Sequence, residues 1–388
     1  MASFKMIGTI SMPKETEKFH PYDERTSEKG WQMKTLRLNV RCSDSTHMIQ
    51  IRSGNWADGH GVIYTSKRMP DGKFENIQVP FGERMKESWI SEVADTRKYV
   101  LDLDYSARRD ALKSGAETIK TGKSFTDDEL TKMGVKSEAE IEKAYKDSCS
   151  KRTEFLAETD FIDALKEIVE GEAYADKTFE IKGVMEYSYN EETQQFYESY
   201  VPHSVEITTK EPESTARFKF IFGEDSIDEL SKDELGKIFI KGWHREYLNT
   251  QTRKGNFYVP VTVVISTKDT DNKAIEVLKK PFVVIGENLY EYPIVVNMVN
   301  GSERTTITYD DLSDDEKEMV DYGFISLQEC IREHGGAVYG ERVREFRYLK
   351  PGRGFGKGVV ETRLTVDEVK MKPLETEETG LPFDEEEI

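Results

Sequence analysis

The chain has 388 residues, of which 37% are hydrophobic and 11% aromatic, so it is long enough for two or three domains with apolar cores. Its formal net charge of −19 argues against a uniformly basic coat for nucleic acid but permits a local basic groove, because a field depends on where the charges sit. Cys42, Cys149 and Cys330 are too few and too far apart for a disulfide framework, which indicates a reducing, cytoplasmic compartment. No apolar stretch is long enough to span a membrane.

The N-terminal residues predict three β-strands. Residues 33–40 alternate apolar and polar side chains, while residues 6–12 and 48–51 form short apolar runs. Gly8 lies within the first run, where it permits the strong bend that a small closed barrel needs. A bent strand, a long polar loop and two further strands are the opening that an oligonucleotide-binding (OB) barrel would have.

Residues 105–171 change to charged, helix-favouring sequence. Phe161 and Leu165 recur at helical spacing, and Thr126 precedes Glu129 by the three residues of a capping box. We therefore expect a helical insertion, which acts either as a lid over a groove or as a docking arm.

Two later segments share a pattern. Residues 181–183 and 240–242 both read Ile-Lys-Gly, and each is followed, after a polar turn, by Tyr-Val-Pro at residues 200–202 and 258–260. We interpret them as two copies of a β-hairpin and hence as two related modules, although hairpin chemistry alone could also produce the match.

The C-terminal half predicts more strands and one helix. Residues 281–285 and 292–296 have the length and apolar character of strands. A helix capped by Ser313 should follow and plug the end of a barrel, with Met319 among the residues available for its buried stripe. Residues 339–350 and 357–372 read as two further strands.

The expected fold is mainly β with a helical insertion (α+β), built from two OB-like β-barrel modules. The N-terminal module spans residues 1–210 and carries the insertion at about 105–171, and the C-terminal module spans residues 211–372. Residues 373–388 form a disordered acidic tail, because they contain too little apolar surface to fold alone.

Aromatic and basic residues are interleaved in several windows. Single-stranded nucleic acid needs cations that follow the phosphates and flat side chains on which bases stack. The alternative is that many of these aromatic residues belong to the core. The candidate nucleic-acid-binding residues are Trp31, Arg37, Arg41, Arg52, Trp56, Lys182, Tyr187, Lys241, Trp243, Arg245, Tyr247, Arg253, Lys254, Arg347, Arg353, Phe355 and Lys357.

No catalytic signature is present. The sequence contains neither a Gly-x-Ser-x-Gly elbow nor a His-Glu-x-x-His motif, and its six histidines are scattered singly. The Gly-rich residues 352–357 lack the first Gly and the Ser/Thr of a Walker A loop. We expect no enzyme activity, no cofactor and no metal.

The last fourteen residues carry seven acids and no Lys or Arg around a short apolar patch. The candidate partner-binding residues of this tip are Leu381, Pro382, Phe383, Asp384, Glu385, Glu386 and Glu387. The arrangement resembles the tail of bacterial and phage single-stranded-DNA-binding proteins, where an acidic run and a Pro-Phe-type tip recruit replication and repair partners. In the bacterial family Pro-Phe usually ends the chain, whereas residues 384–388 follow it here, so a pocket that reads a terminal Phe carboxylate would not read this tip in the same way.

The resemblance implies a single-stranded-DNA-binding protein of a phage-type replication, recombination and repair system, in the host cytoplasm if the protein is viral. Such a protein would coat the strand and recruit replication and recombination proteins through the tip. Two alternatives remain open: a structural or interaction β-protein without nucleic-acid affinity, and a metal-dependent nuclease or recombination enzyme that uses dispersed carboxylates. The sequence leaves the oligomeric state open.

Overall fold

The computed structural model describes residues 2–121, 124–229, 236–249, 254–268, 270–305, 309, 312–333, 338–352 and 358–370. Within these ranges the chain is mainly β, with a large 15-stranded sheet and several groups of helices, which confirms the predicted α+β character. None of the described helices is both long and apolar enough to cross a membrane.

The first half of the chain forms a closed five-stranded barrel. Its strands are β1 (Ser3–Ser11), β3 (Trp31–Cys42), β4 (Ser45–Trp56), β9 (Phe179–Asn190) and β10 (Gln195–Ile207). They pair around the barrel in the order β1-β3-β4-β10-β9 and back to β1, antiparallel except for the parallel pair of β4 and β10. The short strand β2 (Tyr22–Thr26) pairs with β3.

The second half repeats this strand order. Its barrel consists of β11 (Glu213–Phe222), β13 (Lys237–Asn249), β14 (Lys254–Ser266), β15 (Tyr290–Thr305) and β16 (Val338–Pro351). They pair as β11-β13-β14-β16-β15 and back to β11, again with one parallel pair, β14 with β16. Short strands β12 (Ile227–Asp228) and β17 (Val360–Glu361) pair with β13 and β15. The division at residue 210 into two domains stays a prediction.

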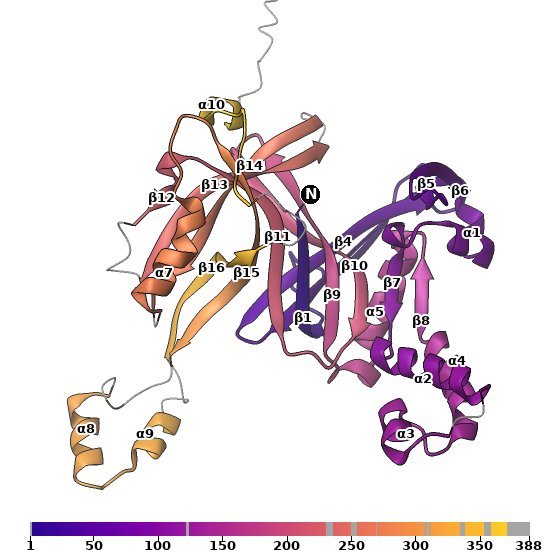
Figure 1. The fold of residues 1–388 in the computed structure, drawn as a ribbon, viewed down its shortest axis with the longest axis horizontal. Helices are drawn as coiled ribbons and strands as arrows, with labels where there is room; N and C mark the ends of the chain where they lie inside the picture. The colour runs from indigo at the N-terminus through magenta and orange to yellow at the C-terminus, as the bar shows by residue number, and fades with distance from the viewer. Residues whose placement is uncertain are drawn as a thin grey trace, which may run out of the picture.

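The two barrels are joined by pairing between their first strands, β1 and β11, which lie side by side at the centre of Figure 1. Ser3 pairs with Arg217 and Ile7 with Glu213, so a single sheet continues from one barrel into the other. The apolar interiors are continuous as well: one core cluster contains Phe4 from the first barrel and Phe220 from the second.

Gly8 marks the point where β1 changes partner. Along one edge β1 pairs with β9, and along the other it pairs first with β11 and then, from Thr9 onward, with β3. A Cβ atom on Gly8 would lie 2.1 Å from the carbonyl oxygen of Arg41, so only glycine permits this close approach of the two backbones. The structure thus gives Gly8 a role in close backbone packing, and the predicted bend stays a prediction.

A helix closes each barrel between its third and fourth strands. Helix α5 (Glu158–Glu170) buries Phe161 and Leu165 in the shared core, and α7 (Asn272–Lys279) buries Ile275 there. The sequence prediction placed the plug of the second barrel after residue 313 and a strand at residues 281–285, and both were wrong. Residues 280–282 form a 3-10 turn that continues from α7 and directs Phe282 into the core.

The insertion between β4 and β9 is longer than predicted. It begins with the hairpin β5 (Val62–Arg68) and β6 (Phe74–Pro80), helix α1 (Glu87–Glu92) and strand β7 (Tyr99–Asp102). The expected helices follow as α2 (Ser106–Ile119), α3 (Asp127–Met133) and α4 (Ile141–Ser150). Strand β8 (Arg152–Phe155) pairs with β7 within the range predicted as helical. The capping box of Thr126 and Glu129 is confirmed.

A buried ion pair fastens these helices to the sheet. Asp102, fully buried at the end of β7, accepts hydrogen bonds from both terminal nitrogens of the Arg109 guanidinium on α2, one of them 2.6 Å long. Asp104 accepts a further bond of 2.6 Å from Arg108. Such bidentate geometry fixes the orientation of α2, since a buried carboxylate without its partner would be strongly destabilising.

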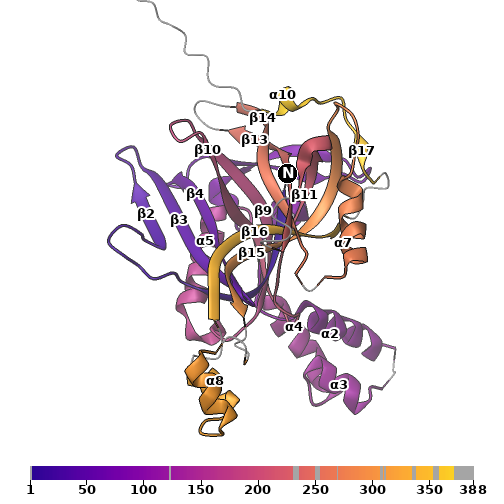
Figure 2. The same ribbon diagram turned by 90° about the vertical axis from the view of Figure 1, so that its left-hand side faces the viewer.

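Between β15 and β16 lie two short helices, α8 (Asp314–Asp321) and α9 (Leu327–Glu333), instead of the single predicted one. They stand away from the second barrel in Figures 1 and 2. Gly323, with φ of +72°, occupies the left-handed region at the turn after α8. The strand predicted at residues 357–372 is limited to β17, and helix α10 (Val366–Val369) follows it. Residues 371–388 lie outside the described part of the chain.

The two hairpins with the shared Ile-Lys-Gly pattern are β9 with β10 and β13 with β14. They provide the fourth and fifth strands of the first barrel but the second and third strands of the second barrel. They are therefore not corresponding copies, and the predicted repetition is wrong. The glycines have the same use: a Cβ on Gly183 would lie 2.7 Å from the Phe4 side chain, and one on Gly242 would lie 2.7 Å from that of Phe220.

We predict that Gly8→Ala lowers the free energy of unfolding by about 1–3 kcal/mol, because the new methyl group would overlap the backbone of β3. Urea unfolding monitored by circular dichroism measures the change. Gly82→Ala is the matched control, since the nearest atom to its Cβ would be 3.9 Å away. Equal unfolding midpoints for the two variants would contradict the close approach of β1 and β3.

Candidate nucleic-acid interface

The outward face of the hairpin β3–β4 collects the five candidates from the N-terminal module. Side chains alternate along a strand, and the core takes Leu36, Leu38 and Val40 from β3 and Ile49 and Ile51 from β4. The intervening positions of both strands therefore point away from the barrel interior. They include all five predicted residues: Trp31, Arg37, Arg41, Arg52 and Trp56.

The three arginines of this face differ in what they bind. Arg37 donates from Nε to Gln50 Oε1 at 3.0 Å and from Nη1 to the carbonyl oxygen of His20 at 3.0 Å, so it holds the loop before β2. Arg41 and Arg52 are exposed, and within the described ranges neither has an ion-pair partner. These two guanidinium groups are the ones available to an anionic chain.

The two tryptophans meet at the far end of the same hairpin. Their ring centroids are 5.3 Å apart at 83°, and Trp56 also stacks on His60 at 4.7 Å. Trp31 lies across Gly54, where a Cβ would come within 2.7 Å of its Nε1. A cavity of about 420 Å³ opens here, and the exposed Tyr64 of β5 also lines it. The sequence prediction did not include His60 and Tyr64, because a turn separates them from Trp56 and no strand periodicity links the three.

The corresponding hairpin of the second barrel, β13–β14, presents Lys241, Trp243, Arg245 and Tyr247 outward. Arg245 and Tyr247 are exposed, and Lys241 forms an ion pair of 3.0 Å with Asp228. Lys254 is exposed at the start of β14.

Trp243, however, is half-buried and packs in a small apolar cluster. The later segment 358–370 provides two members of this cluster, Leu364 and Val369. Tyr258, which pairs next to it across the hairpin, belongs to the same cluster. Trp243 thus packs within the protein, and its assignment as a base-stacking residue stays a prediction.

Two candidates on β9 have other surroundings. Tyr187 lies against the ring of His244 at 4.7 Å between the barrels, and burial raises its pKa well above the usual value. It is a packing residue with one edge in a cleft, as the core alternative proposed. Lys182 is exposed and forms an ion pair with Glu180.

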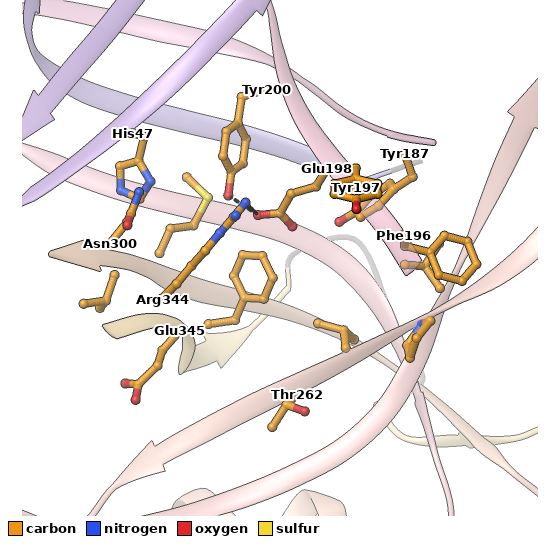
Figure 3. A pocket seen from close by; sticks show the side chains of 16 residues that line it. His47, Tyr187, Phe196, Tyr197, Glu198, Tyr200, Thr262, Asn300, Arg344 and Glu345 are labelled. Carbon is orange, nitrogen blue, oxygen red and sulfur yellow. Dashed lines mark hydrogen bonds and ion pairs between the residues drawn. The ribbon is translucent and has the colours of Figure 1, made fainter. Parts of the chain in front are cut away.

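The cleft between the barrels contains an ion pair that crosses from one to the other (Figure 3). Glu198 of β10 accepts a hydrogen bond of 2.9 Å from the Tyr200 hydroxyl and pairs with Arg344 of β16. Phe196 and Tyr197 lie on the same wall as Glu198. With a volume of about 360 Å³ and both charges already paired, the cleft offers aromatic surface more than net charge.

The remaining described candidate is Arg347, which is half-buried on β16. Arg347 donates from Nε to Glu345 at 3.0 Å on β16. Seven candidates of the tail and four basic or aromatic candidates lie outside the described part of the chain. Outside the described residues lie Arg253, Arg353, Phe355, Lys357, Leu381, Pro382, Phe383, Asp384, Glu385, Glu386 and Glu387.

No family model and no curated protein matches this chain. A search of solved structures found a deletion mutant of the single-stranded DNA binding protein from Thermus aquaticus, at 7% sequence identity and a TM-score of 0.26. The alignment covers 77% of this chain and 87% of that one. A TM-score of this size carries no argument about fold or function. Among the described residues, no group of three or more His, Cys, Asp or Glu is arranged to hold a metal ion.

His47 connects the two barrels at the wall of the cleft. Its side chain is buried, and Nε2 lies 2.9 Å from the hydroxyl of Ser214 on β11. Burial lowers the pKa of His47 to about 4, and Arg344 lowers it further in the same direction, whereas a backbone hydrogen bond to Met298 opposes the shift. The junction is therefore built around a neutral imidazole.

We predict that acid weakens this junction between pH 6.5 and pH 4. In that window the unfolded chain binds a proton at His47 that the folded chain excludes, so the free energy of unfolding falls as the pH falls, by up to about 3 kcal/mol. His47→Gln should lose this part of the slope in urea titrations at several pH values. His203, whose pKa burial also lowers, keeps its own contribution in both proteins. An unchanged slope in the variant would contradict the prediction.

Proposed function

We propose that this protein binds single-stranded DNA on the outward face of β3–β4, without catalysing a reaction. The observation that carries the proposal is the gathering of Arg41, Arg52, Trp31 and Trp56 on one face of one hairpin. We also propose that both barrels are of the OB type. Each has five strands in the order first, second, third, fifth, fourth, and each carries a helix between its third and fourth strands.

The chemistry of this face suits a flexible strand. Exposed guanidinium groups attract phosphates, and they lie on the strands that OB barrels use for oligonucleotides. Stacking of a base on an aromatic side chain contributes about 1–3 kcal/mol, and it tolerates any sequence because every base has a flat face. The net charge of −19 does not oppose this, since the field at the hairpin depends on the local arginines.

The second barrel contributes differently. Arg245, Tyr247 and Lys254 can extend the path of the strand along β13–β14, while Trp243 and its surroundings are closed by residues 358–370. We therefore assign the main binding energy to the first barrel.

The wider role is a proposal from the tail. We propose that the acidic tip with Leu381, Pro382 and Phe383 recruits replication and recombination proteins of a phage-type system in the host cytoplasm. Deleting residues 375–388 should weaken this recruitment and leave the barrels intact.

We predict that Arg41→Ala and Arg52→Ala each weaken binding to oligo(dT) and reduce the slope of log K against log salt by about 0.7, because each removes one phosphate contact. Fluorescence anisotropy over a salt series measures both quantities. Lys132→Ala, an exposed cation on α3, is the charge-matched control and should change neither. Oligonucleotide binding that is absent at every salt concentration would instead support a structural role.

We predict that oligo(dT) quenches Trp31 and Trp56 but not Trp243, since the first two lie on the main binding face whereas Trp243 packs in a cluster with Leu364 and Val369. The double variant Trp31→Phe/Trp56→Phe should lose most of the quenching and bind more weakly. Trp243→Phe should retain both the quenching and the affinity. Quenching that survives the double variant but disappears in Trp243→Phe would move the site to the second barrel.

A further inference from the structure

The two helices between β15 and β16, residues 312–333, form a separate arm. Figure 1 shows α8 and α9 at the end of β15 and β16, away from both barrels. The arm has an apolar cluster of its own, in which Leu312 and Cys330 are buried and Val320, Ile325 and Leu327 pack against them. The arm thus has its own small apolar core.

Both helices of the arm begin with a capping box, which stabilises short helices. Ser313 Oγ accepts from the Glu316 amide at 3.4 Å, and Glu316 Oε2 accepts from the Ser313 amide at 2.9 Å. Ser326 and Glu329 repeat the arrangement, with distances of 3.2 Å and 3.1 Å. The turn between the helices is fixed as well, because the amide of Phe324 donates to the carbonyl of Met319 at 2.9 Å.

This turn exposes three large apolar side chains. Met319 is 47% exposed, Tyr322 is 74% exposed and Phe324 is 80% exposed. The rings of Tyr322 and Phe324 are 6.4 Å apart, so they form one patch. The neighbouring Val320 and Ile325 are turned into the cluster of the arm. An ordered turn that exposes aromatic rings to water is typical of a docking surface. Binding a partner would remove the rings from water, which is energetically favourable.

The charge around the patch selects the partner. Helix α8 contains five acids, Asp314, Asp315, Glu316, Glu318 and Asp321, against the single Lys317. A phosphate chain would be repelled there, although aromatic rings alone would suit bases. A basic segment would be attracted, and its apolar residues could cover the rings.

We propose that the arm is a docking surface for another protein, whose contacting segment is an amphipathic helix with Lys or Arg beside its apolar face. Tyr322 and Phe324 are the anchors, and the acids of α8 attract the basic flanks. The site is independent of the DNA-binding face on β3–β4 and does not require the proposed function to be correct.

The test uses the full chain and a synthetic helical peptide made of Leu and Lys, labelled for anisotropy. The double variant Tyr322→Ser/Phe324→Ser should bind this peptide at least tenfold more weakly, while keeping every charge of the protein. Ile285→Ser is the matched control, because Ile285 is 79% exposed elsewhere on the second barrel, and it should leave the affinity unchanged. Asp315→Asn/Asp321→Asn should weaken binding several-fold at low salt and less at high salt.

Equal peptide affinity in the double variant and the wild type would overturn the proposal, because attraction to acids anywhere on the surface would then explain binding. Equal affinity for a peptide with Glu in place of Lys would do the same. Two further measurements would assign the patch to a different occupant. Self-association that the double variant abolishes would assign it to a second copy of this chain. A loss of oligo(dT) affinity in the double variant would assign it to DNA. Thermal unfolding confirms that each variant is folded.

Discussion

The pairing of β1 with β11 is the interaction on which the remaining structure depends. Residues 3–7 of β1 are hydrogen-bonded to β9 on one edge and to β11 on the other, so the same five residues belong to both barrels. This pairing brings Ser214 to His47, Asn300 to the carbonyl of Thr46 at 2.8 Å, and Arg344 to Glu198. Each of these contacts joins side chains or backbone from different halves of the chain, and none could form if the first strands separated.

The candidate interface follows from the same arrangement. A barrel closed by β1 and β9 turns one face of the β3–β4 hairpin inward, and its apolar residues bury themselves there. The other face is left to polar and aromatic residues. Within it Arg37 is used by the protein itself, to hold the loop at His20 and to contact Gln50, while Arg41 and Arg52 remain accessible. Arg37 and Arg41, on the same strand, thus have different roles, because Gln50 and the His20 carbonyl bind Arg37.

Sequence patterns predicted those strands and helices that depend mainly on neighbouring residues. Alternation located β3, short apolar runs located β1 and β4, and the capping box at Thr126 located α3. Contacts with distant residues could not be predicted in this way: Trp243 lies on the outward side of β13, yet residues more than one hundred positions later pack against it. Helix α7 has only eight residues, too few for a clear period, and the apolar residues after it were mistaken for a strand. The shared Ile-Lys-Gly pattern predicted a repeat, but it reflects similar local packing. In each hairpin the glycine lies against a phenylalanine side chain, Phe4 or Phe220.

The covering of Trp243 by residues 358–370 makes the two barrels unequal despite their common strand order. On the β3–β4 hairpin the two tryptophans pack against each other, whereas on β13–β14 Trp243 packs in a cluster with Leu364 and Val369. Strands of the same order therefore leave different surfaces exposed in the two barrels, because a segment that follows the last barrel strand packs against one aromatic hairpin and not the other.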